Sequence, residues 1–269
     1  YLSQTLSMVF VLGLTVLGVR GGIQLKPIGI LNASQYAPSQ ETPVVLNSAF
    51  TLMRSYGQQG IQKQSFFKDE KEMYAIFDAQ KNYASADSLG NVLPMQKKNV
   101  FVIILESFSA EHIGALTHQK GNRNSDFTPF LDSLAEKSIV FHGFANGKRS
   151  IEGIPAVLAS LPTWMTEDFI TSQYASDKFN SLASLLKTEG YNTSFFHGGK
   201  NGTMGFDAFC RSAGFDAYYG KNEYPNQADF DGHWGIWDEP YLQYIAQTLN
   251  KFPKPFMSAV FTLSSHHPY

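Results

Sequence analysis

One run of apolar, largely β-branched residues that ends in a carboxylate constrains the fold of this chain most. Residues 99–105 read Asn-Val-Phe-Val-Ile-Ile-Leu, and Glu106 follows directly. A run without alternation of polar and apolar residues is typical of a strand covered on both faces in a parallel sheet. Open α/β sheets bind ligands and metals at the carboxyl ends of such strands. Glu106 is therefore a candidate ligand residue, or else only the exposed end of the strand and the cap of the next turn.

Further along the chain, expected strands alternate with expected helices. Apolar segments at Ser138–Phe144, Tyr191–His197 and Phe256–Thr262 are the other expected strands. The expected helices have apolar faces bounded by capping residues, glycine or proline, and lie at 126–137, 154–160, 180–189, 205–213 and 238–251. This βαβα order predicts an α/β fold, with a mostly parallel sheet and helices on both faces.

Composition excludes several classes of function. The 269 residues include 43% hydrophobic residues, which is enough for a substantial core. A net charge of −2 gives no electrostatic reason to expect a nucleic-acid partner. The single cysteine, Cys210, excludes an intramolecular disulfide and a thiolate metal cluster.

The first segment has the composition of a membrane helix. Residues Leu2–Val19 are mostly apolar and precede Arg20, and a spanning helix needs about 20 such residues. We expect residues 1–20 to be the C-terminal part of a transmembrane helix; the alternative is a buried core helix. Glycine, proline and small polar residues then predict a linker with short helices, one near Ser48–Arg54 and a charged one at Lys68–Lys81. The predicted domains are thus 1–20 (helix), 21–97 (linker) and 98–269 (α/β domain).

Four expected strand ends carry polar groups. They are Glu106, the loop 146–150, His197 and the segment 264–269, which reads Ser-Ser-His-His-Pro-Tyr. The carboxyl ends of parallel strands lie on one edge of a sheet, so these groups are expected to converge on one pocket.

The loop Asn146-Gly-Lys-Arg-Ser150 runs into an expected helix. Ser150 is thereby placed near a helix N-terminus, where free N–H groups and the macrodipole stabilise an alkoxide or a phosphate. Lys148 and Arg149 add positive charge beside it. The alternative is that Ser150 is an ordinary N-cap.

These motifs together resemble the alkaline-phosphatase/sulfatase superfamily, and within it the lipoteichoic acid synthase-like membrane phosphoglycerol transferases. The resemblance covers residues 95–269 and rests on an ordered set of segments: Val100–Ser107, Thr128–Asp132, Gly147–Ser150, Phe196–Gly199, Gly214–Asp216, Trp234–Asp238 and Thr262–Tyr269. The family implies a sulfatase-like catalytic domain that follows a membrane domain, on the outer face of the cytoplasmic membrane.

The resemblance also implies roles for individual residues. Glu106 matches the first acidic ligand of a divalent metal, Mn²⁺ or Mg²⁺. Ser150 matches the nucleophile, which also contacts the metal; Arg149 competes for the aligned position, but arginine cannot attack. His266 matches a histidine that contacts the phosphoglycerol group, and His197 falls in a matching His-Gly segment that lines the pocket. With Lys148 and Arg149, these two histidines are the expected substrate-binding residues.

Three departures from the family pattern stand out. A second acid–histidine metal pair is expected after Tyr269, so we expect this chain alone to have an incomplete metal site. Tryptophan and arginine substrate contacts of the family fall on Met204 and Phe206. The Cys/Ser-x-Pro-x-Arg signature of sulfatases is not found after Ser150, where the sequence reads Ile-Glu-Gly.

The resemblance implies metal-dependent transfer of a phosphoglycerol-type head-group from a membrane phospholipid to a glycan or glycolipid hydroxyl through a phospho-serine intermediate. Two alternatives remain open. One keeps the fold but uses phosphoethanolamine or hydrolyses a phosphodiester; the single cysteine counts mildly against the phosphoethanolamine transferases, which tend to carry disulfides. The other is a catalytically inactive sensor or binding module of the envelope.

Overall fold

The computed structural model describes residues 1–23, 28–29, 32–33, 36–37, 41–57, 60–62, 64–77, 91, 94–117, 127–141, 143–145 and 147–267. Before the sheet lie α1 (Leu2–Arg20), α2 (Thr42–Val45), α3 (Ser48–Ser55) and α4 (Glu70–Ile76). The α/β part contains β1 (Val100–Ile104), η2 (Ala110–His112), α5 (Gly114–Thr117), α6 (Pro129–Ala135), α7 (Ser150–Ala159), η4 (Phe169–Thr171), α8 (Leu182–Thr188), β2 (Asn192–Phe196), η5 (Thr203–Gly205), α9 (Phe206–Ser212), β3 (Ala217–Tyr219), η6 (Lys221–Glu223), η7 (Gln227–Asp229), α10 (Asp238–Leu249) and β4 (Phe256–Phe261).

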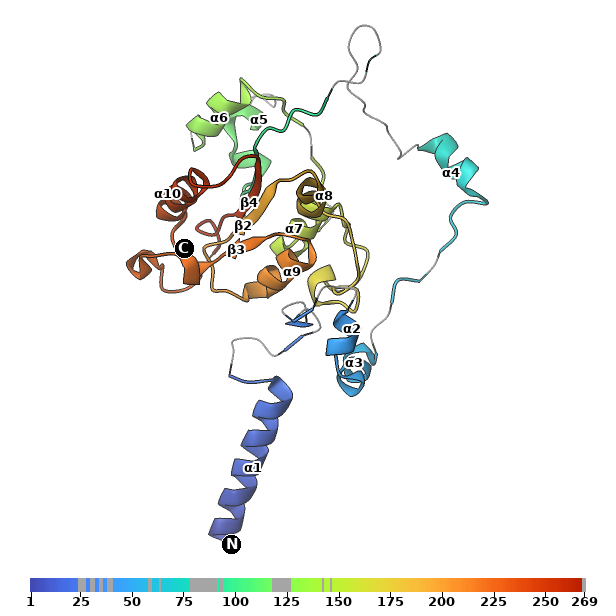
Figure 1. Ribbon diagram of the computed structural model, residues 1–269, viewed down its shortest axis with the longest axis vertical. Helices are drawn as coiled ribbons and strands as arrows, with labels where there is room; N and C mark the ends of the chain where they lie inside the picture. The colour runs from blue at the N-terminus through green and yellow to red at the C-terminus, as the bar shows by residue number, and fades with distance from the viewer. Residues whose placement is uncertain are drawn as a thin grey trace.

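The four described strands form one sheet in the order β1-β4-β2-β3, and every neighbouring pair is parallel (Figure 1). Phe261, the last residue of β4, pairs with Ile104, the last residue of β1. Phe196 at the end of β2 pairs with Val260. The carboxyl ends therefore lie together on one edge, and the predicted α/β fold with a mostly parallel sheet is confirmed.

Helices cover the two faces of the sheet unequally. On one face, apolar residues of α7, α8 and α9 pack with alternate residues of the strands, among them Met257, Ala259 and Phe261. On the other face, Tyr241 and Ile245 of α10 pack against Phe196 and Val260. β4 is buried throughout because both of its faces are covered and it has a neighbour on each side.

Strand β1 departs from the expectation of full burial. Its odd-numbered residues Phe101 and Ile103 remain 39% and 53% exposed, whereas Val100, Val102 and Ile104 pack against the main core. The reason is position: β1 is the edge strand of the described sheet, and α10 covers β2 and β4 on that face. A continuous apolar run thus does not guarantee that both faces are covered in this part of the chain.

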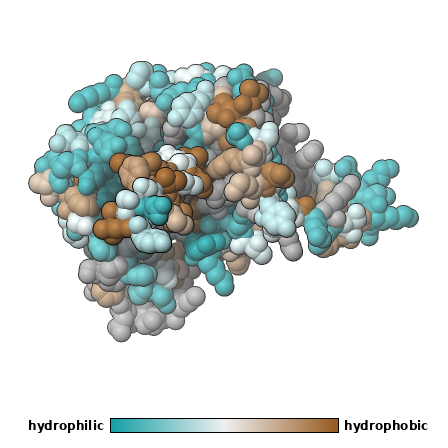
Figure 2. Space-filling model, turned by 90° about the horizontal axis from the view of Figure 1, so that it is seen from below, coloured by the Kyte–Doolittle hydropathy of each residue, from teal (hydrophilic) through white to brown (hydrophobic). Residues whose placement is uncertain are grey.

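Helix α1 projects away from the α/β part (Figure 1). None of its residues is buried, and its mean hydropathy over 18 residues is 1.8. By length and composition it is the one helix among the described residues able to cross a membrane. The view from the end of the molecule where α1 lies shows apolar residues gathered on that side (Figure 2). The exposure of α1 contradicts the alternative of a buried core helix.

Several expected boundaries shift, and one expected strand is wrong. Ser138–Phe144 forms no strand in its described residues, and Ile139, Phe141 and Phe144 are strongly exposed, so the segment has no sheet partner that would make it a strand. The helix expected at 154–160 begins earlier, at Ser150, and ends at Ala159. The charged helix expected at Lys68–Lys81 covers only Glu70–Ile76, and residues 78–81 lie outside the described residues. The remaining expected helices and strands are confirmed to within a few residues.

Candidate active site

The site is built around the Glu106 carboxylate at the end of β1. Its backbone N–H donates to Thr262 Oγ1 at 2.8 Å, and Thr262 follows β4 directly. Ser107 Oγ donates to Glu106 Oε1 at 2.9 Å, from a residue whose φ of 55° lies in the left-handed region. Glu106 is only 8% exposed, and its bond to Thr262 holds it between the ends of β1 and β4. The reading of Glu106 as a merely exposed strand end is wrong.

Ser150 is the first residue of α7, and its hydroxyl points at the same carboxylate. Ser150 Oγ donates to Glu106 Oε2 at 2.6 Å, across 44 positions of sequence. The N-cap of α7 is Arg149, in extended conformation, so Ser150 does not cap its own helix. The structure thus brings together the two residues that the sequence nominated as nucleophile and acidic ligand. Their chemical roles stay predictions.

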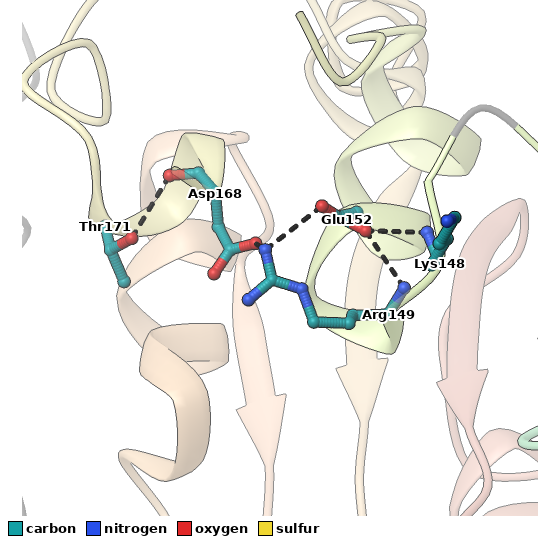
Figure 3. Close-up of polar contacts among 5 residues, drawn as sticks. All are labelled: Lys148, Arg149, Glu152, Asp168 and Thr171. Carbon is teal, nitrogen blue, oxygen red and sulfur yellow. Dashed lines mark hydrogen bonds and ion pairs between the residues drawn. The ribbon is translucent and has the colours of Figure 1, made fainter. Parts of the chain in front are cut away.

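The loop before Ser150 wraps around the carboxylate of Glu152. Lys148 and Arg149 donate their backbone N–H groups to Glu152 Oε2 at 2.7 and 2.9 Å (Figure 3). These bonds satisfy donors at the start of α7 that have no partner within the helix. They are also the main reason that the pKa of Glu152 lies below its usual value. A methyl group on Gly147 would lie 2.6 Å from Glu152 Cβ, so the loop needs glycine there.

The guanidinium of Arg149 lies between two carboxylates (Figure 3). Its Nη2 donates to Asp168 Oδ1 at 2.5 Å and to Glu152 Oε1 at 3.1 Å. Hydrogen bonding to Glu152 first, and the charge of Asp168 second, raise the pKa of Arg149. The guanidinium is therefore held in place one residue before Ser150 in the sequence, and the two carboxylates balance its charge locally. Lys148 contributes a backbone contact, and its side chain is exposed.

His197 follows β2 and is almost fully buried. One ring nitrogen, Nδ1, lies 3.1 Å from the carbonyl oxygen of Phe261, and the ring stacks on the Phe261 ring at 5.2 Å between centroids. Burial lowers the pKa of His197 to about 4, while the Phe261 carbonyl and the nearby charge of Glu106 oppose that shift. At neutral pH the ring is therefore uncharged. Among the described residues its Nε2 is buried and has no hydrogen-bond partner.

His266 lies on the loop after β4 and is not joined directly to Ser150 or Glu106 by the contacts of the described residues. Its ring packs on Trp234 at 4.3 Å between centroids, and its Nδ1 lies 2.6 Å from the carbonyl oxygen of His267. Pro268 and Tyr269, which complete this motif, lie outside the described residues. A substrate role of His266 stays a prediction.

The first turn of α10 holds this histidine loop in place. The Asp238 carboxylate accepts the backbone N–H groups of Leu263 and Ser264, both at 2.8 Å. Ser264 Oγ accepts the backbone N–H of Asp238 at 2.8 Å in return. The segment Trp234–Asp238 thus supports the loop that carries His266.

Sequence reasoning missed Thr262, Glu152, Asp168 and Asp238 as residues that build the site. A glutamate at the third helical position after the loop signals a cap, which identifies Glu152. Asp168 has no such signal, because its partner Arg149 lies 19 positions away and a loop separates them. Met204 and Phe206, which replace expected substrate contacts, have different roles: Phe206 is buried and packs edge-on against His197.

The donor set suits a hard divalent cation, but only in part. Oxygen ligands from a carboxylate and a hydroxyl match the preference of Mg²⁺ and Mn²⁺, and the unpaired Nε2 of His197 lies buried nearby. No group of three or more His, Cys, Asp or Glu side chains able to hold a metal occurs among the described residues. Glu106 and Ser150 thus fit two positions of a site that needs further ligands.

Comparison with known proteins agrees with this geometry. The Sulfatase family matches residues 98–269. Lipoteichoic acid synthase-like YvgJ of Bacillus subtilis is 27% identical over 76% of this chain, and phosphoglycerol transferase I of Escherichia coli is 25% identical over 65%. The chain spans 32% and 24% of the lengths of these two relatives.

A solved structure of an alkaline phosphatase superfamily protein from Vibrio parahaemolyticus gives a similar result. It superimposes with a TM-score of 0.57 at 32% identity, over 66% of this chain and 43% of that one. The parallel sheet with Glu106 and Ser150 at its carboxyl edge, the match to residues 98–269 and this shared fold lead to one conclusion. The chain belongs to the Sulfatase family, within the alkaline phosphatase superfamily.

Proposed function

We propose that the protein transfers a phosphoglycerol-type head-group from a membrane phospholipid to a hydroxyl of a glycan or glycolipid, with Ser150 as the nucleophile. The observation that carries this proposal is the 2.6 Å hydrogen bond from Ser150 Oγ to Glu106 at the carboxyl edge of the sheet. The names of the relatives, a lipoteichoic acid synthase-like protein and a phosphoglycerol transferase, support the choice of head-group.

The chemistry assigns a task to each residue. Ser150 Oγ attacks the head-group phosphorus, a P–O bond forms to the serine, and the bond to the diacylglycerol oxygen breaks. An acceptor hydroxyl then displaces the serine and takes the head-group. Arg149 and Lys148 supply positive charge beside the phosphoryl oxygens, and His197 and His266 bind the head-group from the other strand ends.

Glu106 and Ser150 are the residues that would hold a divalent ion, Mn²⁺ or Mg²⁺. The ion would lower the pKa of the serine hydroxyl and neutralise phosphoryl charge. Glu106 presents its carboxylate from a position fixed by Thr262 and Ser107, which reduces the reorganisation needed when the ion binds.

The proposed location of the reaction is based on α1. We propose that residues 1–20 lie in the cytoplasmic membrane, that 21–97 form an extracytoplasmic linker and that 98–269 form the catalytic domain on the outer side. The exposed, apolar α1 supports this arrangement, because it would keep the site near lipid head-groups.

The test uses the full-length protein in lipid vesicles with labelled phosphatidylglycerol and added Mn²⁺. Ser150→Ala is expected to lower turnover by at least about 10³-fold, since the nucleophile is lost. Ser133→Ala, on the exposed side of α6, is the matched control and should leave turnover unchanged. Undiminished turnover by Ser150→Ala would contradict the assignment, and preference for labelled phosphatidylethanolamine would change the head-group.

A further inference from the structure

Asp168 is a buried carboxylate outside the residues that the proposed reaction uses. Its side chain is 11% exposed, and it lies just before η4, on the far side of Arg149 from Glu152 (Figure 3). A buried carboxylate is costly unless it is paired, and Arg149 supplies the partner through Nη2. The pair therefore exists because two segments, the loop before α7 and the start of η4, bring the charges together.

The backbone around Asp168 is itself fixed. The carbonyl oxygen of Asp168 accepts the backbone N–H of Thr171 at 3.0 Å and the Thr171 hydroxyl at 3.2 Å. Ile170, in the same turn, is buried in the core cluster that contains Ile154 and Leu158 of α7. The carboxylate is thus attached to the packed part of the molecule, whereas the Arg149 side chain is 57% exposed.

Glu152 and Asp168 act on different parts of Arg149. Glu152 Oε2 accepts backbone N–H groups, so it shapes the path of the loop, while Oε1 contacts the guanidinium. The contact of Asp168 with this loop is through the guanidinium. Removal of the Asp168 charge should therefore leave the loop backbone in place but release the direction of the Arg149 side chain.

A guanidinium has five N–H donors in a rigid fork. Both carboxylates contact the same nitrogen, Nη2, and more than half of the side chain is exposed. The two hydrogen bonds from Nη2 fix the direction of the guanidinium plane, in the residue directly before Ser150 in the sequence. The remaining donors, the N–H groups of Nη1 and Nε, can each bind a phosphoryl oxygen.

We propose that Asp168 is a positioning residue for the reaction: it orients the Arg149 guanidinium so that its remaining N–H donors face the phosphoryl group attacked by Ser150. This inference rests on the proposed function. It predicts that Asp168 affects the chemical step through Arg149 and not through the general stability of the domain.

The experiment is a double-mutant cycle in the full-length protein in vesicles that contain phosphatidylglycerol. Asp168→Asn keeps the shape but removes the charge, and is expected to lower kcat by about 10²-fold with KM changed less than about threefold, as expected for a misplaced contact of the transition state. In an Arg149→Ala background, Asp168→Asn should change kcat by less than about threefold, because the guanidinium through which Asp168 acts is absent. Asp168→Glu should recover part of the loss.

Controls separate the possible failures. Asp177→Asn, at an exposed aspartate of the following loop, should match the unaltered protein. If the unaltered protein turns over the lipid and Ser150→Ala does not, the proposed function stands, and additive effects in the cycle or a normal kcat for Asp168→Asn would overturn the role of Asp168. If Ser150→Ala is fully active, the proposed function itself fails.

A variant that does not fold is handled by a second substitution. Arg149→Lys keeps the positive charge but loses the planar fork. It is expected to lower kcat by a factor similar to that of Asp168→Asn, and an unchanged kcat would overturn the inference.

Discussion

The two sides of the candidate site are held in different ways. On the nucleophile side, Ser150 and the loop before it are fixed by hydrogen bonds to the carboxylates of Glu106 and Glu152. On the histidine side, His197 is fixed by burial and ring stacking, and the loop of His266 is held by the carboxylate of Asp238. The difference teaches that the Ser150 side chain is oriented by a carboxylate from another strand end, whereas the His197 ring is oriented by burial and stacking.

The largest expected effect concerns the burial of His197. Its folded pKa of about 4 lies below the ordinary value of 6.5, so protonation favours the unfolded chain. The stabilisation is complete well above pH 6.5 and is lost as pH falls towards 4, where the loss reaches about 3 kcal/mol. Urea denaturation with a chelator present, between pH 7.5 and 4, measures it. His197→Asn should reduce the slope, His233→Gln at an exposed position should not, and an unchanged slope in both would contradict the account.

A comparable effect is expected on the nucleophile side from Gly147→Ala. The added methyl group would lie 2.6 Å from Glu152 Cβ and 2.7 Å from Glu152 Oε2, so the loop before Ser150 must move. Displacement of a nucleophile by about 1 Å lowers turnover by about 10²-fold. Gly153→Ala in the same α7 helix meets nothing within 4 Å and is the matched control. Equal kcat values for the two variants would show that the path of the loop before Ser150 does not affect turnover.

Gly235→Ala tests the packing that holds the histidine side. A methyl group there would clash with the backbone carbonyl of Gly198 and with a Leu263 methyl group. Overpacking of this kind costs about 1–3 kcal/mol of unfolding free energy. Urea denaturation measures it, with Gly143→Ala, which meets nothing within 4 Å, as the control. Identical urea midpoints for the two variants would mean that the structure around Gly235 accommodates the methyl group at little cost.

The smallest expected effect is that of Asp238→Asn. An asparagine amide has one acceptor oxygen, so one of the N–H groups of Leu263 and Ser264 loses its partner. The expected cost is about 1 kcal/mol of unfolding free energy. Glu239→Gln, one residue further in α10 and exposed, should cost nothing measurable. If Asp238→Asn lowered kcat by more than its loss of stability explains, the His266 loop would lie closer to the reacting groups than its described contacts indicate.

The sequence predicts the parts of the site that lie at the ends of regular elements. The apolar runs locate Glu106 and His197, and the loop-to-helix transition locates Ser150, because strand ends in a parallel sheet share an edge. The expected strand at Ser138–Phe144 is wrong because an apolar run signals burial only where a partner covers it, and Phe144 is 95% exposed. Short β3 has three residues and too little pattern to be predicted.

Contacts between side chains from separate loops remain outside such reasoning. The Arg149–Asp168 pair depends on where η4 packs, and the Asp238 contacts depend on the crossing of α10 over the sheet. Neither segment has a periodicity that encodes its partner. The sequence thus nominates the reactive groups better than it nominates the groups that orient them.

The hydrogen bond from the backbone N–H of Ile61 to Tyr174 Oη, at 2.8 Å, has a mechanical consequence. It fastens the segment after α3 to the loop that follows η4, six residues beyond Asp168. The 40 residues between α1 and Ile61 can span at most about 140 Å when fully extended, whereas the 79 residues between α1 and β1 could span about 270 Å. While this hydrogen bond is formed, the greatest distance between α1 and the α/β part is set by 40 residues and not by 79.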